Sequence, residues 1–131
     1  MMNLKTIKIV VLSLLFASCA TTVKFPISDL VPAAEISATK KQDSNNNYTI
    51  KVTAENLASP DRLDPPRDYY VVWGVTEDNG VKNLGLLSNK NAKKVELETI
   101  TPFSVKEIFI TAEKEGNISE PSNLEITRKK L

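Results

Sequence analysis

The sequence has no histidine and only one cysteine among its 131 residues. Without histidine, the chain has no Ser-His-Asp or Cys-His catalytic set, no imidazole metal site and no histidine pH switch. A single cysteine cannot form an intrachain disulfide or a multi-cysteine zinc site. We therefore expect no enzyme activity, no metal and no cofactor, and a fold stabilised by its apolar core alone.

An excess of one charge is also missing, since 17 Lys+Arg stand against 16 Asp+Glu for a formal net charge of +1. A strongly basic balance is the usual signature of a nucleic-acid-binding protein, so we expect no nucleic-acid partner. The length fits one domain.

The N-terminal segment has the three parts of a secretory signal peptide. Lys5 and Lys8 precede the uncharged run Ile9–Ala17 (IVVLSLLFA), and the small residue Ser18 follows it. That run is about half of the roughly 20 residues that a spanning helix needs. We therefore predict a cleaved signal peptide over residues 1–18 rather than an uncleaved membrane anchor.

The lone cysteine stands at the end of this segment. The sequence Phe16-Ala17-Ser18-Cys19 resembles the bacterial lipobox, in which the cysteine is lipidated and becomes the new N-terminus, although Phe16 replaces the usual leucine. The alternative is an ordinary signal peptide that happens to end in cysteine. A diacylglyceryl group supplies the two acyl chains that stable attachment requires, so we predict that Cys19 anchors the chain to a membrane. Ala20, with no aspartate after the cysteine, resembles an outer-membrane sorting signal and favours a periplasm-facing, outer-membrane location in the cell envelope.

Residues 20–32 (ATTVKFPISDLVP) contain two prolines and little periodicity. With the lipidated N-terminus they form a predicted tether, residues 19–32, that lifts the domain away from the bilayer. Phe25, Ile27 and Leu30 are apolar, so part of this segment could instead lie on the domain.

The remaining residues, 33–131, read as one β-rich domain. Tyr48 to Glu55 shows the clearest alternation of apolar and polar residues, and Asp78-Asn79-Gly80 favours a tight hairpin turn. No 3.6-residue apolar stripe is present. The expected strands cover residues 34–39, 48–55, 69–76, 81–88, 93–100, 105–113 and 123–129. This pattern predicts an all-β, Ig-like or fibronectin-III-like antiparallel β-sandwich of about seven strands.

The predicted core is built from apolar residues of the central strands. We expect Trp73 to lie between the two sheets, as a central-strand tryptophan does in Ig-like domains. The other predicted core residues are Ile50, Val52, Ile108 and Ile110.

Several short segments then match a known pattern. They are Tyr70-Val71-Val72-Trp73, the turn at Gly80, Leu84-Gly85-Leu86-Leu87, Thr111-Ala112-Glu113, Gly116 and Pro121. Together, over about residues 69–127, they are similar to the extracytoplasmic C-terminal domain of anti-sigma-K factors, and this resemblance implies an Ig-like sandwich. Those factors carry a sigma-binding segment and a spanning helix ahead of the domain, and here a lipobox stands in their place, so the resemblance implies no sigma binding. The whole chain also resembles small uncharacterised lipoproteins of Bacteroidetes-type bacteria, but this resemblance does not point to any particular activity.

Three aspartates in a proline-rich loop form the first candidate binding site. Asp61, Asp64 and Asp68 could offer oxygen ligands to Ca²⁺, but Arg62 and Arg67 compete for the same carboxylates. A solvated loop with internal ion pairs is the favoured interpretation.

Two tyrosines form the second candidate site, because aromatic faces can stack on sugar rings. Strand alternation places Tyr69 and Trp73 on one face and Tyr70 on the other, which favours core packing over a glycan platform.

Glu113 and Glu115 could be paired acids for glycoside chemistry, but carboxylates on a wet sheet edge are the simpler interpretation.

The C-terminal Arg128-Lys129-Lys130 could contact anionic lipid, although a solvated terminus explains it as well.

Taken together, these features predict a membrane-anchored lipoprotein with a non-enzymatic Ig-like domain that binds an envelope protein. The alternative is a carbohydrate- or cell-wall-binding module.

Overall fold

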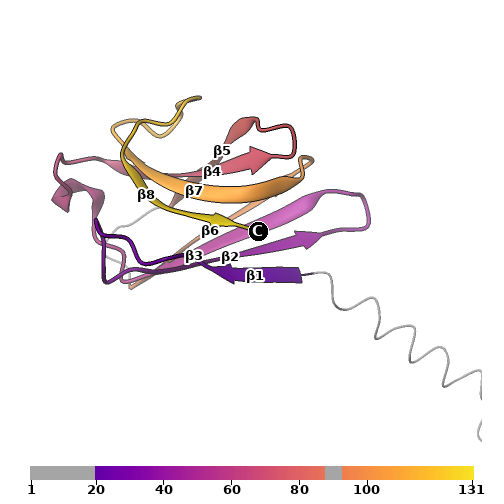
Figure 1. The fold of residues 1–131 in the computed structure, drawn as a ribbon, viewed down its shortest axis with the longest axis horizontal. Helices are drawn as coiled ribbons and strands as arrows, with labels where there is room; N and C mark the ends of the chain where they lie inside the picture. The colour runs from indigo at the N-terminus through magenta and orange to yellow at the C-terminus, as the bar shows by residue number, and fades with distance from the viewer. Residues whose placement is uncertain (1–19, 88–92) are drawn as a thin grey trace, which may run out of the picture.

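Two antiparallel four-stranded sheets make up the part of the chain that the computed structural model describes, residues 20–87 and 93–131 (Figure 1). The first sheet has the order β1-β2-β3-β6 and the second β5-β4-β7-β8. The strands are β1 (Ala20–Lys24), β2 (Glu35–Gln42), β3 (Tyr48–Glu55), β4 (Tyr69–Thr76), β5 (Val81–Leu87), β6 (Lys94–Thr101), β7 (Val105–Glu113) and β8 (Glu125–Lys130). The prediction of an all-β sandwich is confirmed.

The seven expected strands correspond to β2 through β8, with ends that differ by at most a few residues. β2, β3 and β6 lie in the first sheet, and β5, β4, β7 and β8 make up the second. The predicted hairpin joins β4 to β5. Asn79 adopts a φ of 66°, and the Thr76 N–H donates to the Gly80 carbonyl at 2.8 Å.

The predicted tether is instead part of the domain. β1 pairs with β2 over its whole length, from Ala20 opposite Lys41 to Lys24 opposite Ser37. Phe25, Ser28 and Val31, in the loop that follows, are buried. The sequence does not predict β1, because its exposed residues do not alternate between apolar and polar. Its pairing with β2 uses backbone groups, which every sequence has. The folded domain therefore already includes residues 20–32, which precede the predicted boundary at residue 33.

The main apolar core lies between the sheets. Ile50, Val52, Ile108 and Ile110 belong to it and are at most 1% exposed.

Trp73 is fully buried, but the expectation that it lies between the sheets is wrong. It belongs with Val71 and Phe109 to a second apolar cluster, called here the Trp73 cluster. Tyr70 and Val72 point into the main core, so alternation along β4 turns Trp73 to the outer face of its sheet. Its ring stacks on Phe109 with centroids 6.1 Å apart.

Two later segments cover the Trp73 cluster. Ile118, in the loop 114–124 between β7 and β8, packs against it. This loop is called here the covering loop. The guanidinium carbon of Arg128, in β8, lies 4.2 Å from the Phe109 ring centroid, and the same side chain forms ion pairs with Glu107 and Glu125. The first residue of the C-terminal basic cluster is thus a fixed part of the fold.

A β-bulge in β5 attaches the covering loop. Val72 lies opposite Gly85 while Trp73 lies opposite Asn83, so Leu84 is an extra residue. Gly85 has a φ of +133°, which side-chain-bearing residues rarely adopt. The shift turns Asn83 outward, where its amide donates to the carbonyls of Gly116 and Ile118 at 3.0 and 2.9 Å.

The sandwich has two distinct ends (Figure 1). The turn end holds the start of β1, the C-terminal Leu131 and the short turns 43–47, 77–80 and 102–104. The loop end holds the long connections 25–34, 56–68 and 114–124.

Candidate functional site

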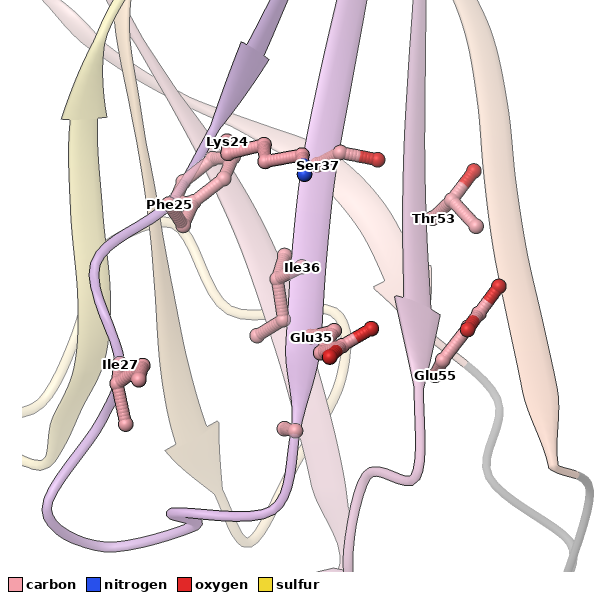
Figure 2. Close-up of a pocket in the computed structure, with 9 residues that line it drawn as sticks. Lys24, Phe25, Ile27, Glu35, Ile36, Ser37, Thr53 and Glu55 are labelled. Carbon is pink, nitrogen blue, oxygen red and sulfur yellow. The ribbon is translucent and has the colours of Figure 1, made fainter.

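A hollow of about 360 Å³ lies on the first sheet near the loop end (Figure 2). Residues of β1, β2, β3 and the loop after β1 line it: Lys24, Phe25, Ile27, Ala34, Glu35, Ile36, Ser37, Thr53 and Glu55.

The loop after β1 supplies the most exposed large apolar side chain of the described residues, Ile27, which is 76% exposed. Its neighbours Phe25 and Ser28 are buried, and the Phe25 N–H donates to the Ile36 carbonyl at 2.9 Å. Thr127 of β8 donates its hydroxyl to the Pro26 carbonyl at 3.0 Å. Contacts on both sides thus fix the loop, and Ile27 is presented outward from a rigid backbone.

The opposite side of the hollow is acidic. Glu35 and Glu55 lie directly opposite each other in the β2–β3 register, an arrangement of like charges that is unfavourable in a sheet. Lys24 extends across β2 toward Ser37 (Figure 2). An apolar side chain on one side and two carboxylates on the other suit a partner segment that carries an apolar residue next to a cationic one.

The predicted aspartate site lies in the loop between β3 and β4. Asp61 belongs to a short 3-10 helix, Pro60–Arg62, and the three aspartates Asp61, Asp64 and Asp68 are all exposed. Within residues 20–87 and 93–131, no three acidic side chains come together as a metal-binding group. In the same part of the chain, no ion pair joins these aspartates to an arginine, so the predicted internal ion pairs are absent.

The two tyrosines of the predicted aromatic site point in opposite directions. Tyr70 is fully buried, and its hydroxyl donates to the Ala58 carbonyl at 2.6 Å. Burial, and secondarily the negative charge of Asp61, raise the pKa of Tyr70 to about 12. Tyr69 is 43% exposed on the outer face of the second sheet. Because Tyr70 and Trp73 are inaccessible, these residues do not form a stacking platform.

Glu113 is only 4% exposed, although the sequence suggested a wet sheet edge. Its carboxylate accepts hydrogen bonds from the Thr111 hydroxyl at 2.6 Å and from the Ser122 N–H at 2.9 Å. Thr111 in turn accepts the Trp73 indole N–H at 2.8 Å. Glu115 is exposed, so the two glutamates form no acid pair. Glu113 instead fastens the covering loop, which the sequence could not show because that loop's position depends on the whole fold.

The predicted signal peptide and the lipidation residue Cys19 lie outside the described residues. Among the residues that are described, no helix has the length and apolarity needed to span a bilayer.

Comparison of the chain with protein-family models, with curated proteins and with solved structures finds no match. The resemblance to anti-sigma-K factors therefore stays a prediction.

Proposed function

We propose that this chain is a lipoprotein, anchored in the cell envelope through Cys19, whose β-sandwich binds an envelope protein without catalysing a reaction. The outer membrane, facing the periplasm, is the proposed location. The lipobox-like sequence at residues 16–19 supports the anchor.

The observation that carries the binding role is the placement of Ile27. A side chain of this size costs about 1.5 to 3 kcal/mol when left in water rather than buried. Here the backbone that presents Ile27 is held by buried neighbours and by hydrogen bonds to β2 and β8. Rigid presentation of an apolar side chain lowers the entropic cost of binding, which favours a protein partner at this position.

The carbohydrate-binding alternative has less support. It rests on accessible aromatic faces, and Tyr69 is the only member of the Tyr69, Tyr70 and Trp73 group that is exposed. Protein binding is therefore the preferred function.

Crosslinking in intact cells, followed by affinity capture of the tagged, membrane-bound protein, tests this preference. The variant Ile27→Asp should lose most of a captured protein partner, because a buried charge replaces an apolar contact. The control Tyr69→Asp changes an exposed side chain on the outer face of the second sheet, outside the Ile27 hollow, and should retain the partner. Recovery of glycan without protein, or equal capture by both variants, would overturn the proposal.

A further inference from the structure

The start of β1 fixes where the domain stands relative to its anchor. Cys19 immediately precedes Ala20, the first residue of β1, and consecutive Cα atoms are only about 3.8 Å apart. If Cys19 carries the lipid, as proposed above, no tether separates the bilayer from the folded domain. The turn end of the sandwich must then lie at the membrane surface.

One row of residues across the first sheet links the anchor position to an exposed apolar side chain. Ala20 lies opposite Lys41, Lys41 opposite Thr49, and Thr49 opposite Ile100. Three strand spacings place Ile100 about 14 Å from Ala20 along this row. Ile100 is 67% exposed, although it lies within a strand.

The adjoining turn adds an aromatic side chain. Phe103, between β6 and β7, is 47% exposed, and the Lys82 ammonium lies 5.1 Å from its ring centroid. Aromatic rings and lysines with apolar stems are the side chains that membrane interfaces accommodate best. Lys41 and Lys82 are both exposed at this end.

We propose that the turn end docks on the lipid bilayer that carries the anchor, with Ile100 and Phe103 in the interfacial region and Lys41 and Lys82 at the lipid phosphates. This orientation rests on the proposed lipidation of Cys19. A strand of eight residues spans about 26 Å, so the loop end and Ile27 are held roughly that far from the headgroups. The domain then acts as a short upright stalk that presents its loop end to the partner.

Site-specific fluorescence on the lipidated full-length protein tests this orientation. The only native cysteine is the lipidated one, so an introduced cysteine is a unique labelling site. An environment-sensitive fluorophore is attached at Ile100→Cys, at Phe103→Cys or at the control Ile27→Cys. All three side chains are exposed, and unchanged melting temperatures verify the fold. The labelled proteins are reconstituted in vesicles of phosphatidylethanolamine and phosphatidylglycerol.

At positions 100 and 103 we expect a blue-shifted emission, quenching by spin-labelled lipid and several-fold weaker quenching by aqueous iodide than at position 27. Equal iodide quenching at all three positions, in protein that floats with the vesicles, would overturn the orientation while leaving the anchor intact. Labels shielded from both quenchers would also overturn it, because a second copy of the chain would then cover this end. Protein that does not float with the vesicles would instead contradict the proposed anchoring.

Discussion

Trp73 shows that a residue can be fully buried without belonging to the main core. Every second residue of β4 faces the space between the sheets, and Trp73 occupies the alternate set. Its burial depends on the loop 114–124 and on Arg128, both of which come later in the chain. The contribution of Trp73 to the stability of the fold therefore depends on the packing of a loop that is distant in the sequence.

Replacing Trp73 by alanine should lower the free energy of unfolding by about 3 to 5 kcal/mol, because it removes a large buried ring and leaves a cavity. Trp73→Phe keeps a ring next to Phe109 but removes the indole donor to Thr111, and should cost about 1 kcal/mol. Urea unfolding followed by circular dichroism measures both. An unchanged midpoint for Trp73→Ala would show that the Trp73 cluster does not support the fold.

The raised pKa of Tyr70 predicts that the folded domain loses stability at alkaline pH. Its pKa in the folded chain is about 12, above the ordinary value of 10.0. As the pH rises from about 10 to 12, the unfolded chain releases the phenol proton while the folded chain keeps it, so the free energy of unfolding falls. The contribution is complete below pH 10, and about 2 to 3 kcal/mol should be lost by pH 12.

Tyr70→Phe should lack this component of the alkaline loss, although it starts about 1 kcal/mol less stable because the Ala58 carbonyl loses its donor. Tyr69→Phe, at an exposed position, is the control. The measurement is the melting temperature of the wild type and both variants between pH 8 and pH 12. If the melting temperatures of the wild type and Tyr70→Phe fall in parallel, Tyr70 is not the source of the alkaline loss of stability.

At the scale of elements, β1 extends the folded domain to residues before the predicted boundary at residue 33. It covers one edge of β2 and leads into the loop that contributes Phe25 and Val31 to the main core. An uncovered β2 would expose its backbone donors and acceptors to other chains. The segment is therefore structural, and its removal tests the domain boundary.

A fragment of residues 33–131 should be about 3 to 6 kcal/mol less stable than residues 20–131, because it loses two buried apolar side chains in addition to β1. The intermediate fragment 25–131 keeps Phe25 and Val31 and separates the effect of the strand from that of the loop. Thermal unfolding of the three fragments provides the comparison. Equal stability of the longest and shortest fragments would restore the tether interpretation.

Across the whole molecule, the sequence predicts the strands and buried residues that follow from local alternation of apolar and polar residues. β3 shows it most clearly, since Ile50, Val52 and Ala54 are buried and alternate with more exposed residues. The direction of Trp73 could not be predicted because β4 is apolar on both faces. The hollow beside Ile27 was not predicted either, because it forms between a loop and three strands that come together only in the folded sheet.

The two ends of the sandwich give the proposed function its geometry, because Ala20, next to the proposed anchor Cys19, lies at one end and the Ile27 hollow at the other. That geometry depends on the modification of Cys19. The most direct test is mass spectrometry of the N-terminal peptide of the mature protein purified from membranes, with Cys19→Ser as the comparison. We predict a mature chain that starts at Cys19 with a diacylglyceryl modification, and a Cys19→Ser protein that leaves the membrane fraction. An unmodified Cys19, or a Cys19→Ser protein that stays in the membrane, would contradict the account.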